Sequence, residues 1–92
     1  MKGDKSVNIT VRKATEADQA AMQSKPTWGC GVSEFDWHYD SEETALIIEG
    51  EVTITYDGGI VTFGAGDLCV FPAGLSCVWK VTKPVNKHYL FK

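Results

Sequence analysis

The middle of the chain lacks cations. No lysine or arginine occurs between Lys25 and Lys80, whereas nine acidic residues fall within that span. A surface that binds nucleic acid needs clustered cations to displace counterions from the phosphates, so we expect no nucleic-acid partner. The basic residues near the C-terminal end are expected to form a solvated edge, because charge runs usually face water; they are Lys80, Lys83, Lys87 and Lys92.

Long apolar runs are also missing. No window approaches the ~20 apolar residues of a membrane-spanning helix, and the first ten residues carry charge without the apolar core of a signal peptide. We therefore expect a cytoplasmic protein with no membrane partner. Cys30, Cys69 and Cys77 are an odd number of cysteines without Cys-x-x-Cys spacing. Reduced thiols in the cytoplasm explain them better than a disulfide framework does.

The chain has 92 residues, of which 43% are hydrophobic and 23% are charged. These values are ordinary for one small globular domain. A domain of this size buries only about 60–65% of its unfolded surface. Association with a second copy would add buried area, so we expect a homodimer.

Short alternating segments predict strands. Residues 7–13 alternate apolar and polar side chains, and Thr15 with Asp18 predicts a capped helix of about two turns that ends before Pro26. From Trp28 onward, short apolar segments alternate with glycine- and proline-containing turns, which predicts an antiparallel barrel or sandwich. The predicted strands cover residues 33–40, 44–50, 51–56, 60–63, 68–71, 76–81 and 87–91.

Two segments have the spacing of a known pair of motifs. Glu43 is followed by six residues and Gly50, and Gly66 by five residues, Pro72, one residue and Gly74. This resembles the two signature segments of the cupins. Residues 32–52 and 66–81 are most similar to the small cupins related to (S)-ureidoglycine aminohydrolase and to the ethanolamine-utilisation proteins. The resemblance covers about residues 28–91.

The resemblance implies an all-β fold, the cupin double-stranded β-helix or jelly-roll barrel. On this interpretation residues 28–92 form the barrel of a single domain. Residues 1–27 then add an N-terminal strand and one short helix. Cupins also commonly pair as dimers, which agrees with the expectation from chain length.

The resemblance further implies a set of metal ligands. Metal-binding cupins use two histidines one residue apart, a glutamate and a third histidine; here these positions hold Asp36, His38, Glu43 and Cys77. Thiolate and imidazole favour zinc, and carboxylates accept manganese or iron. The alternative is a metal-free polar pocket in which Glu43, His38 and Cys77 face one another. Glu43 and Cys77 are the candidate catalytic residues, although a nearby carboxylate would raise the pKa of the thiol.

Strand alternation extends this hypothesis to the aromatic residues. Asp36 and His38 share one face of their strand, so if they point into the barrel, Trp37 points outward. Trp79 is two residues after Cys77 and so shares its face of the strand. It is expected to line the ligand pocket with Tyr89 and His38. Such a pocket suits a small polar metabolite with a flat or apolar part.

Three functions remain open at this point. The first is an enzyme that acts on a small nitrogen-containing metabolite with a divalent metal, as the likeness to ureidoglycine aminohydrolase implies. The second is a metal-free module that binds or senses a small ligand, as a dimer. The third is a structural domain without a ligand.

Overall fold

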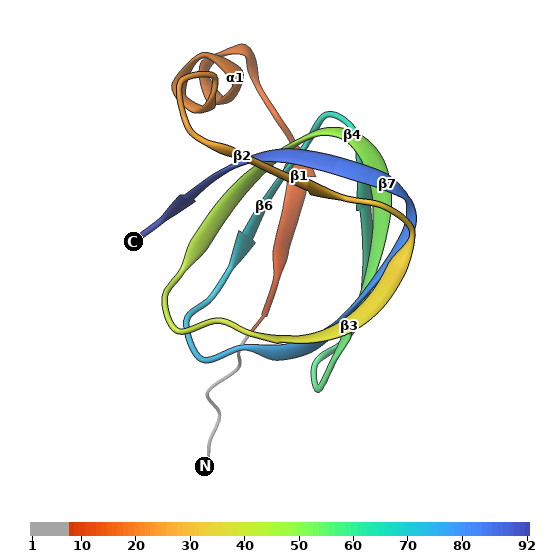
Figure 1. Cartoon of the computed structure of the whole chain (residues 1–92). Coiled ribbons are helices and arrows are strands. Elements are labelled where there is room, and N and C mark those ends of the chain that lie inside the picture. The colour runs from red at the N-terminus through yellow and green to blue at the C-terminus, as the bar shows by residue number, and fades with distance from the viewer. Residues whose placement is uncertain (1–7) are drawn as a thin grey trace.

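A computed structural model describes residues 8–92 as a barrel of strands with one short helix at its edge (Figure 1). The elements run in the following order: β1 (Thr10–Lys13), α1 (Glu16–Met22), β2 (Thr27–Cys30), β3 (Ser33–His38), β4 (Glu43–Tyr56), β5 (Gly59–Gly64), β6 (Asp67–Phe71) and β7 (Ser76–Phe91).

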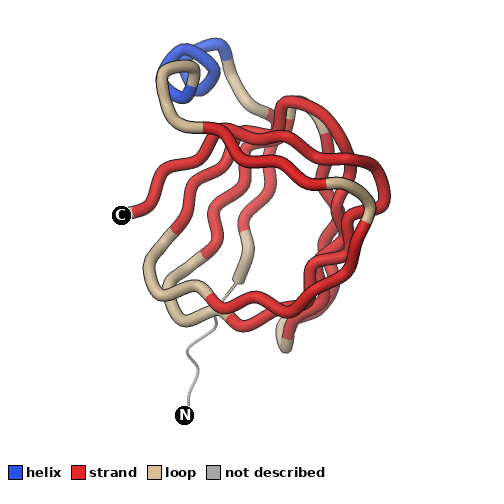
Figure 2. Tube along the Cα trace, in the orientation of Figure 1, coloured by secondary structure: helices blue, strands red, loops and turns tan. Residues whose placement is uncertain are grey.

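Two long strands, β4 and β7, pair with each other and run through both layers of the barrel. The first part of β7 pairs with β3 and with the second part of β4, which also forms a hairpin with β5. The last part of β7 pairs with β2 and with the first part of β4, and β6 and β1 extend that layer. The strands therefore curl around one interior (Figure 2).

The change of layer occurs where β4 bends. The pairing of β4 with β7 shifts register around residues 47–52. Gly50 lies in the bend with φ of 100°, and a Cβ at this position would meet the carbonyl oxygen of Pro84 on β7. Glycine adopts this φ without steric cost, and proline is tolerated within a sheet at such a bulge. Gly50 thus permits the bend that closes the barrel.

Helix α1 begins at a capping box, as the sequence predicts. The backbone N–H of Asp18 donates to Thr15 Oγ1 at 3.1 Å, and the Thr15 N–H donates to Asp18 Oδ2 at 2.8 Å. The Arg12 guanidinium also bonds to Asp18 and, with the Thr15 N–H, holds the pKa of that carboxyl well below its usual range. On the buried side, Met22 packs with Leu46 and Leu68, so the helix covers one outer face of the sheet.

The predicted all-β cupin fold with one short helix is confirmed, and several strand boundaries change. Residues 44–50 and 51–56 join into β4, and 76–81 and 87–91 join into β7. Strand β2 was not predicted. The first predicted strand begins at Val7, which lies outside the described residues. The described part of 1–27 is attached to the barrel through β1, which pairs with β6; the division at residue 28 stays a prediction.

Within residues 8–92, the one helix is too short to cross a membrane.

We expect Gly50→Ala to lower the free energy of unfolding by roughly 1–3 kcal/mol, because it adds both backbone strain and a clash with Pro84. Urea unfolding followed by circular dichroism measures this loss. Gly31→Ala is the matched control, since nothing lies within 4 Å of a Cβ at that position. Equal stability of the two variants would contradict the role of Gly50.

Candidate ligand-binding site

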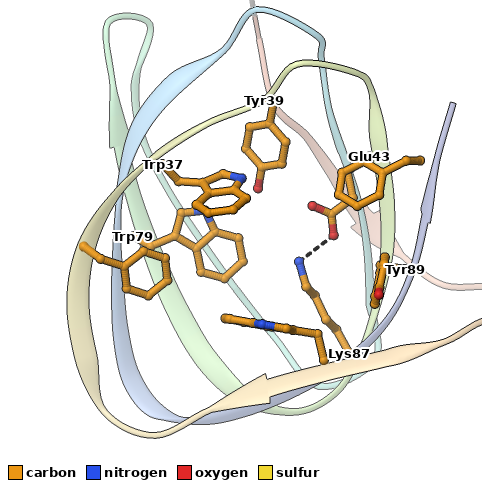
Figure 3. Close-up of a pocket in the computed structure, with 9 residues that line it drawn as sticks. Trp37, Tyr39, Glu43, Trp79, Lys87 and Tyr89 are labelled. Atoms are coloured by element: carbon orange, nitrogen blue, oxygen red, sulfur yellow. Dashed lines mark hydrogen bonds and ion pairs between the residues drawn. The ribbon is translucent and has the colours of Figure 1, made fainter.

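A cavity of about 230 Å³ opens into the barrel between β2, β3, β7 and the start of β4 (Figure 3). Its walls are mostly aromatic, with one carboxylate and one ammonium group. The lining residues are Trp28, Phe35, Trp37, Tyr39, Glu43, Trp79, Lys87, Tyr89 and Phe91. All three tryptophans of the chain contribute to this cavity.

The two charged residues form a buried ion pair. Lys87 Nζ donates to Glu43 Oε2 at 2.5 Å, and the two side chains are only 7% and 3% exposed. Antiparallel pairing of β4 with β7 brings them to the same face of the sheet. An ion pair this deeply buried compensates charges that would otherwise be costly to desolvate.

Aromatic rings surround the Lys87 ammonium group. Its nitrogen lies 4.9 Å from the ring centroid of Trp79 and 5.1 Å from that of Trp28. The rings of Phe71 and Tyr89 are at 5.9 and 6.0 Å. Cations at such distances from ring centres are stabilised by the ring quadrupole. Lys87 therefore occupies an aromatic cage with Glu43 as its counterion.

Two buried polar groups at the cavity, the Tyr39 hydroxyl and the Trp79 indole N–H, make no hydrogen bond of good geometry among the described residues, although Trp79 is near enough to Tyr39 and Cys77 to oppose part of the rise in pKa that burial gives both. The Tyr39 hydroxyl points into the cavity (Figure 3). Burial, and then the charge of Glu43, raise the pKa of Tyr39 above its usual range, so the hydroxyl keeps its proton. Unpaired buried polar groups are costly, and of these two the Tyr39 hydroxyl is the one that a molecule in the cavity could contact.

The structure places Glu43, Trp79 and Tyr89 on the cavity and His38 elsewhere. The predicted orientation of β3 is wrong: Phe35 and Trp37 point inward, because they pair with Trp79 and Cys77 on the inner face of β7. Asp36 and His38 consequently lie on the outer face.

Asp36 and His38 line a separate, more open groove, to which Cys77 also contributes. His38 Nδ1 is 2.7 Å from Ser76 Oγ, and Nε2 is 3.7 Å from a carboxylate oxygen of Asp40. The Asp40 side chain is 98% exposed. A carboxylate so exposed cannot hold the imidazole in one orientation, so these three residues do not form a catalytic triad of the buried kind.

The predicted metal set is therefore divided: Asp36, His38 and Cys77 line the second groove, whereas Glu43 lies on the aromatic cavity. Within residues 8–92, no group of three His, Cys, Asp or Glu side chains is close enough to hold an ion. Lys87 takes the position beside Glu43 that a cation would need. The residues present do not fit the manganese, zinc or iron site that the resemblance implies.

Cys77 does not suit the predicted catalytic role beside Glu43. Its side chain belongs to the hydrophobic core and does not line the cavity. Burial raises the pKa of the Cys77 thiol to about 11 and that of Cys69 to about 12. Both therefore remain protonated near neutral pH, and the thiolate is the nucleophilic form.

Lys87 is the site residue that the sequence analysis missed. It was expected on a solvated edge, and the structure corrects this: Lys87 is 6% exposed. Lysines are rarely buried unless paired, so composition favoured the wrong environment. The alternation of side chains along the strand could have indicated its position, because Lys87 is two residues before Tyr89 and therefore shares its face.

Comparison with known proteins places the chain within a family. The family model described as an EutQ-like cupin domain matches residues 17–89. The chain belongs to this family. A DUF861 family protein from Thermotoga maritima, known from its crystal structure, is 41% identical, with a TM-score of 0.88 over 92% of this chain and 100% of that one.

More distant relatives share the fold. The crystal structure of a putative ethanolamine utilization protein Q from Salmonella typhimurium is 22% identical, with a TM-score of 0.66 over 90% of this chain and 68% of that one. Among curated proteins, acetate kinase EutQ of Clostridioides difficile (strain 630) is 32% identical over 62 residues, which are 62% of this chain and 40% of the relative. The chain thus spans less than half of that relative's length.

We expect Lys87→Met to lower the free energy of unfolding by about 3–5 kcal/mol, because it leaves the Glu43 carboxylate buried without a counterion. The double variant Lys87→Met with Glu43→Leu should recover most of that loss. Lys92→Met is the matched control, since Lys92 is 72% exposed and 3.7 Å from Glu42. No recovery in the double variant, measured by urea unfolding, would show that Lys87 stabilises the fold by other means.

Thiol labelling distinguishes the three cysteines. At pH 8 iodoacetamide should modify the half-buried Cys30 first, because Cys69 and Cys77 are buried and their raised pKa values keep them protonated. Peptide mass spectrometry measures the order, and labelling in urea shows that all three thiols can react once unfolded. Rapid native labelling of Cys77 would contradict the placement of this residue in the core.

Proposed function

We propose that the barrel binds a small, uncharged polar molecule with a flat apolar part, without a metal ion. The observation that carries this proposal is the Lys87–Glu43 pair at the wall of an aromatic cavity. The two residues supply polar contacts to a ligand, and their opposite charges cancel. This function corresponds to the ligand-binding or sensing module that the sequence left open.

The charge of the cavity selects against ions. A bound anion or cation would add an uncompensated charge to a pocket whose two ionic groups already balance, and buried unpaired charge is costly. A neutral acceptor such as a carbonyl or amide oxygen meets two donors instead, the Lys87 ammonium group and the Tyr39 hydroxyl.

The size of the cavity limits the ligand. About 230 Å³ is below the roughly 300–1,000 Å³ of sites that hold drug-sized molecules. The parallel rings of Phe35 and Trp79, at 5.9 Å, and the nearby Trp28 ring form one wall. Such a wall favours a single planar group that stacks against rings.

The nitrogen-containing metabolite suggested by the resemblance fits this class when its nitrogen is an amide or ureide. A metal-assisted reaction like that of ureidoglycine aminohydrolase is disfavoured, because its ligand set is not assembled. The cavity does not favour the acetate kinase activity in one relative's name, because Lys87 is the single cation among its lining residues. The homodimer and the cytoplasmic location stay predictions.

We expect benzamide to raise the melting temperature and to change tryptophan fluorescence, because all three tryptophans line the cavity. Benzoate and benzylammonium are charged counterparts of similar shape and should bind at least about tenfold more weakly. Excess chelator should leave benzamide binding unchanged. Preference for either charged compound, or binding that needs added metal, would contradict the proposal.

Tyr39→Phe tests the polar contact within the same experiment. Removing one hydrogen bond should weaken benzamide binding about three- to tenfold. Tyr56→Phe is the matched control, because Tyr56 ends β4 and does not line the cavity. Equal affinities for the two variants would place benzamide elsewhere on the protein.

A further inference from the structure

The position of Lys87 calls for a reason beyond stability. A buried ion pair can often be replaced by apolar residues of similar volume with little loss of stability, or with a gain. Lys87 nevertheless places a primary amine on the wall of a cavity, at 7% side-chain exposure. Buried lysines with a nearby proton acceptor are the ones that form Schiff bases with carbonyl compounds.

We propose that Lys87 forms a reversible imine with a small aldehyde or ketone that enters this cavity, with Glu43 as the proton acceptor and Tyr39 as a hydrogen-bond donor to the carbonyl oxygen. This inference rests on the proposed binding function and names the substrate class of the same site. A neutral carbonyl compound with a planar apolar part is within the ligand class derived from the cavity's charge and walls.

The groups needed for the reaction are already adjacent. Glu43 Oε2 is 2.5 Å from Lys87 Nζ, which is hydrogen-bonding distance for a direct proton transfer. The Tyr39 hydroxyl makes no hydrogen bond of good geometry among the described residues and points into the cavity (Figure 3). Even with the Trp79 indole N–H nearby, the hydroxyl can donate its own proton to the oxygen of an incoming carbonyl group.

The steps balance without any further reactant. Lys87 first transfers one proton to Glu43, and its free amine adds to the carbonyl carbon, forming the C–N bond as the C=O π bond breaks. One amine proton passes to the oxygen, which gives a carbinolamine. The C–O bond then breaks, and water leaves with that oxygen, that proton and the proton returned by Glu43. The product is a protonated imine.

The surroundings of Lys87 suit this product as well as the resting ammonium group. The protonated imine carries the same single positive charge as the ammonium group it replaces. It would remain beside the Glu43 carboxylate and the rings of Trp28 and Trp79, which are 5.1 and 4.9 Å from Nζ in the resting state. The reaction therefore adds no new charge to the cavity.

The test is reductive trapping on the wild-type protein. Benzaldehyde, at less than one equivalent, is incubated with the protein and sodium cyanoborohydride at pH 7, and each modified lysine is quantified by peptide mass spectrometry. We expect Lys87 to be modified at least about tenfold more than the exposed Lys80 and Lys83, because the cavity holds the aldehyde beside the amine. Modification of Lys87 at or below the level of these two internal controls would overturn the inference.

Two additions separate this inference from the proposed function. Benzyl alcohol has a similar shape and cannot form an imine, so its binding, read by tryptophan fluorescence, tests the cavity alone. Binding of benzyl alcohol without trapping at Lys87 overturns only the imine; absence of both overturns the binding function as well. Lys87→Arg should abolish trapping at position 87, whereas Lys83→Arg should leave both trapping at Lys87 and benzyl alcohol binding unchanged.

Discussion

The ion pair between Lys87 and Glu43 decides what the barrel can hold. It joins the two longest strands, and Lys87 takes the position beside Glu43 that a cation would need. Because the pair is covered by aromatic rings, its charges are compensated from within the chain and not by solvent. The cavity above it is consequently neutral, rich in hydrogen-bond donors and closed to a second cation.

The aromatic residues have a double role around this pair. Tyr39 stacks on Phe71 at 5.1 Å, and Phe71 and Phe63 both contact the Trp79 ring, so the inner wall of the cavity is also part of the core. Trp28, Trp37 and Phe91 lie further out and remain 39–49% exposed. The cavity therefore has a rigid inner end and an apolar rim in contact with solvent. A ligand with one polar and one flat apolar end fits a cavity that is polar at its inner end and apolar at its rim.

The fold was predictable because the glycines of its two motifs lie where the backbone bends or turns. Gly50 of the first segment is the bend of β4, and Gly66 and Gly74 of the second have φ of 90° and 88° in turns. The site was harder. The family histidine positions suggested that Asp36 and His38 face inward, whereas plain hydrophobic alternation would have turned Phe35 and Trp37 to the interior. Lys87 escaped notice because a single sequence does not show which lysine has a buried partner.

A change in which alternate residues face inward explains why β4 was predicted as two strands. In β4 the inward residues are odd-numbered before the bend, as at Glu43 and Ile47, and even-numbered after it, as at Val52 and Ile54. The switch looks like a break between two strands when only the sequence is read. In the structure it is one continuous strand with a bulge.

That continuity links the two layers mechanically. Because β4 and β7 each belong to both layers, neither layer has a set of strands that could separate from the other while keeping its own hydrogen bonds. We therefore expect local opening at the rim of the cavity to involve edge strands such as β2, and the amide protons of β4 and β7 to exchange together.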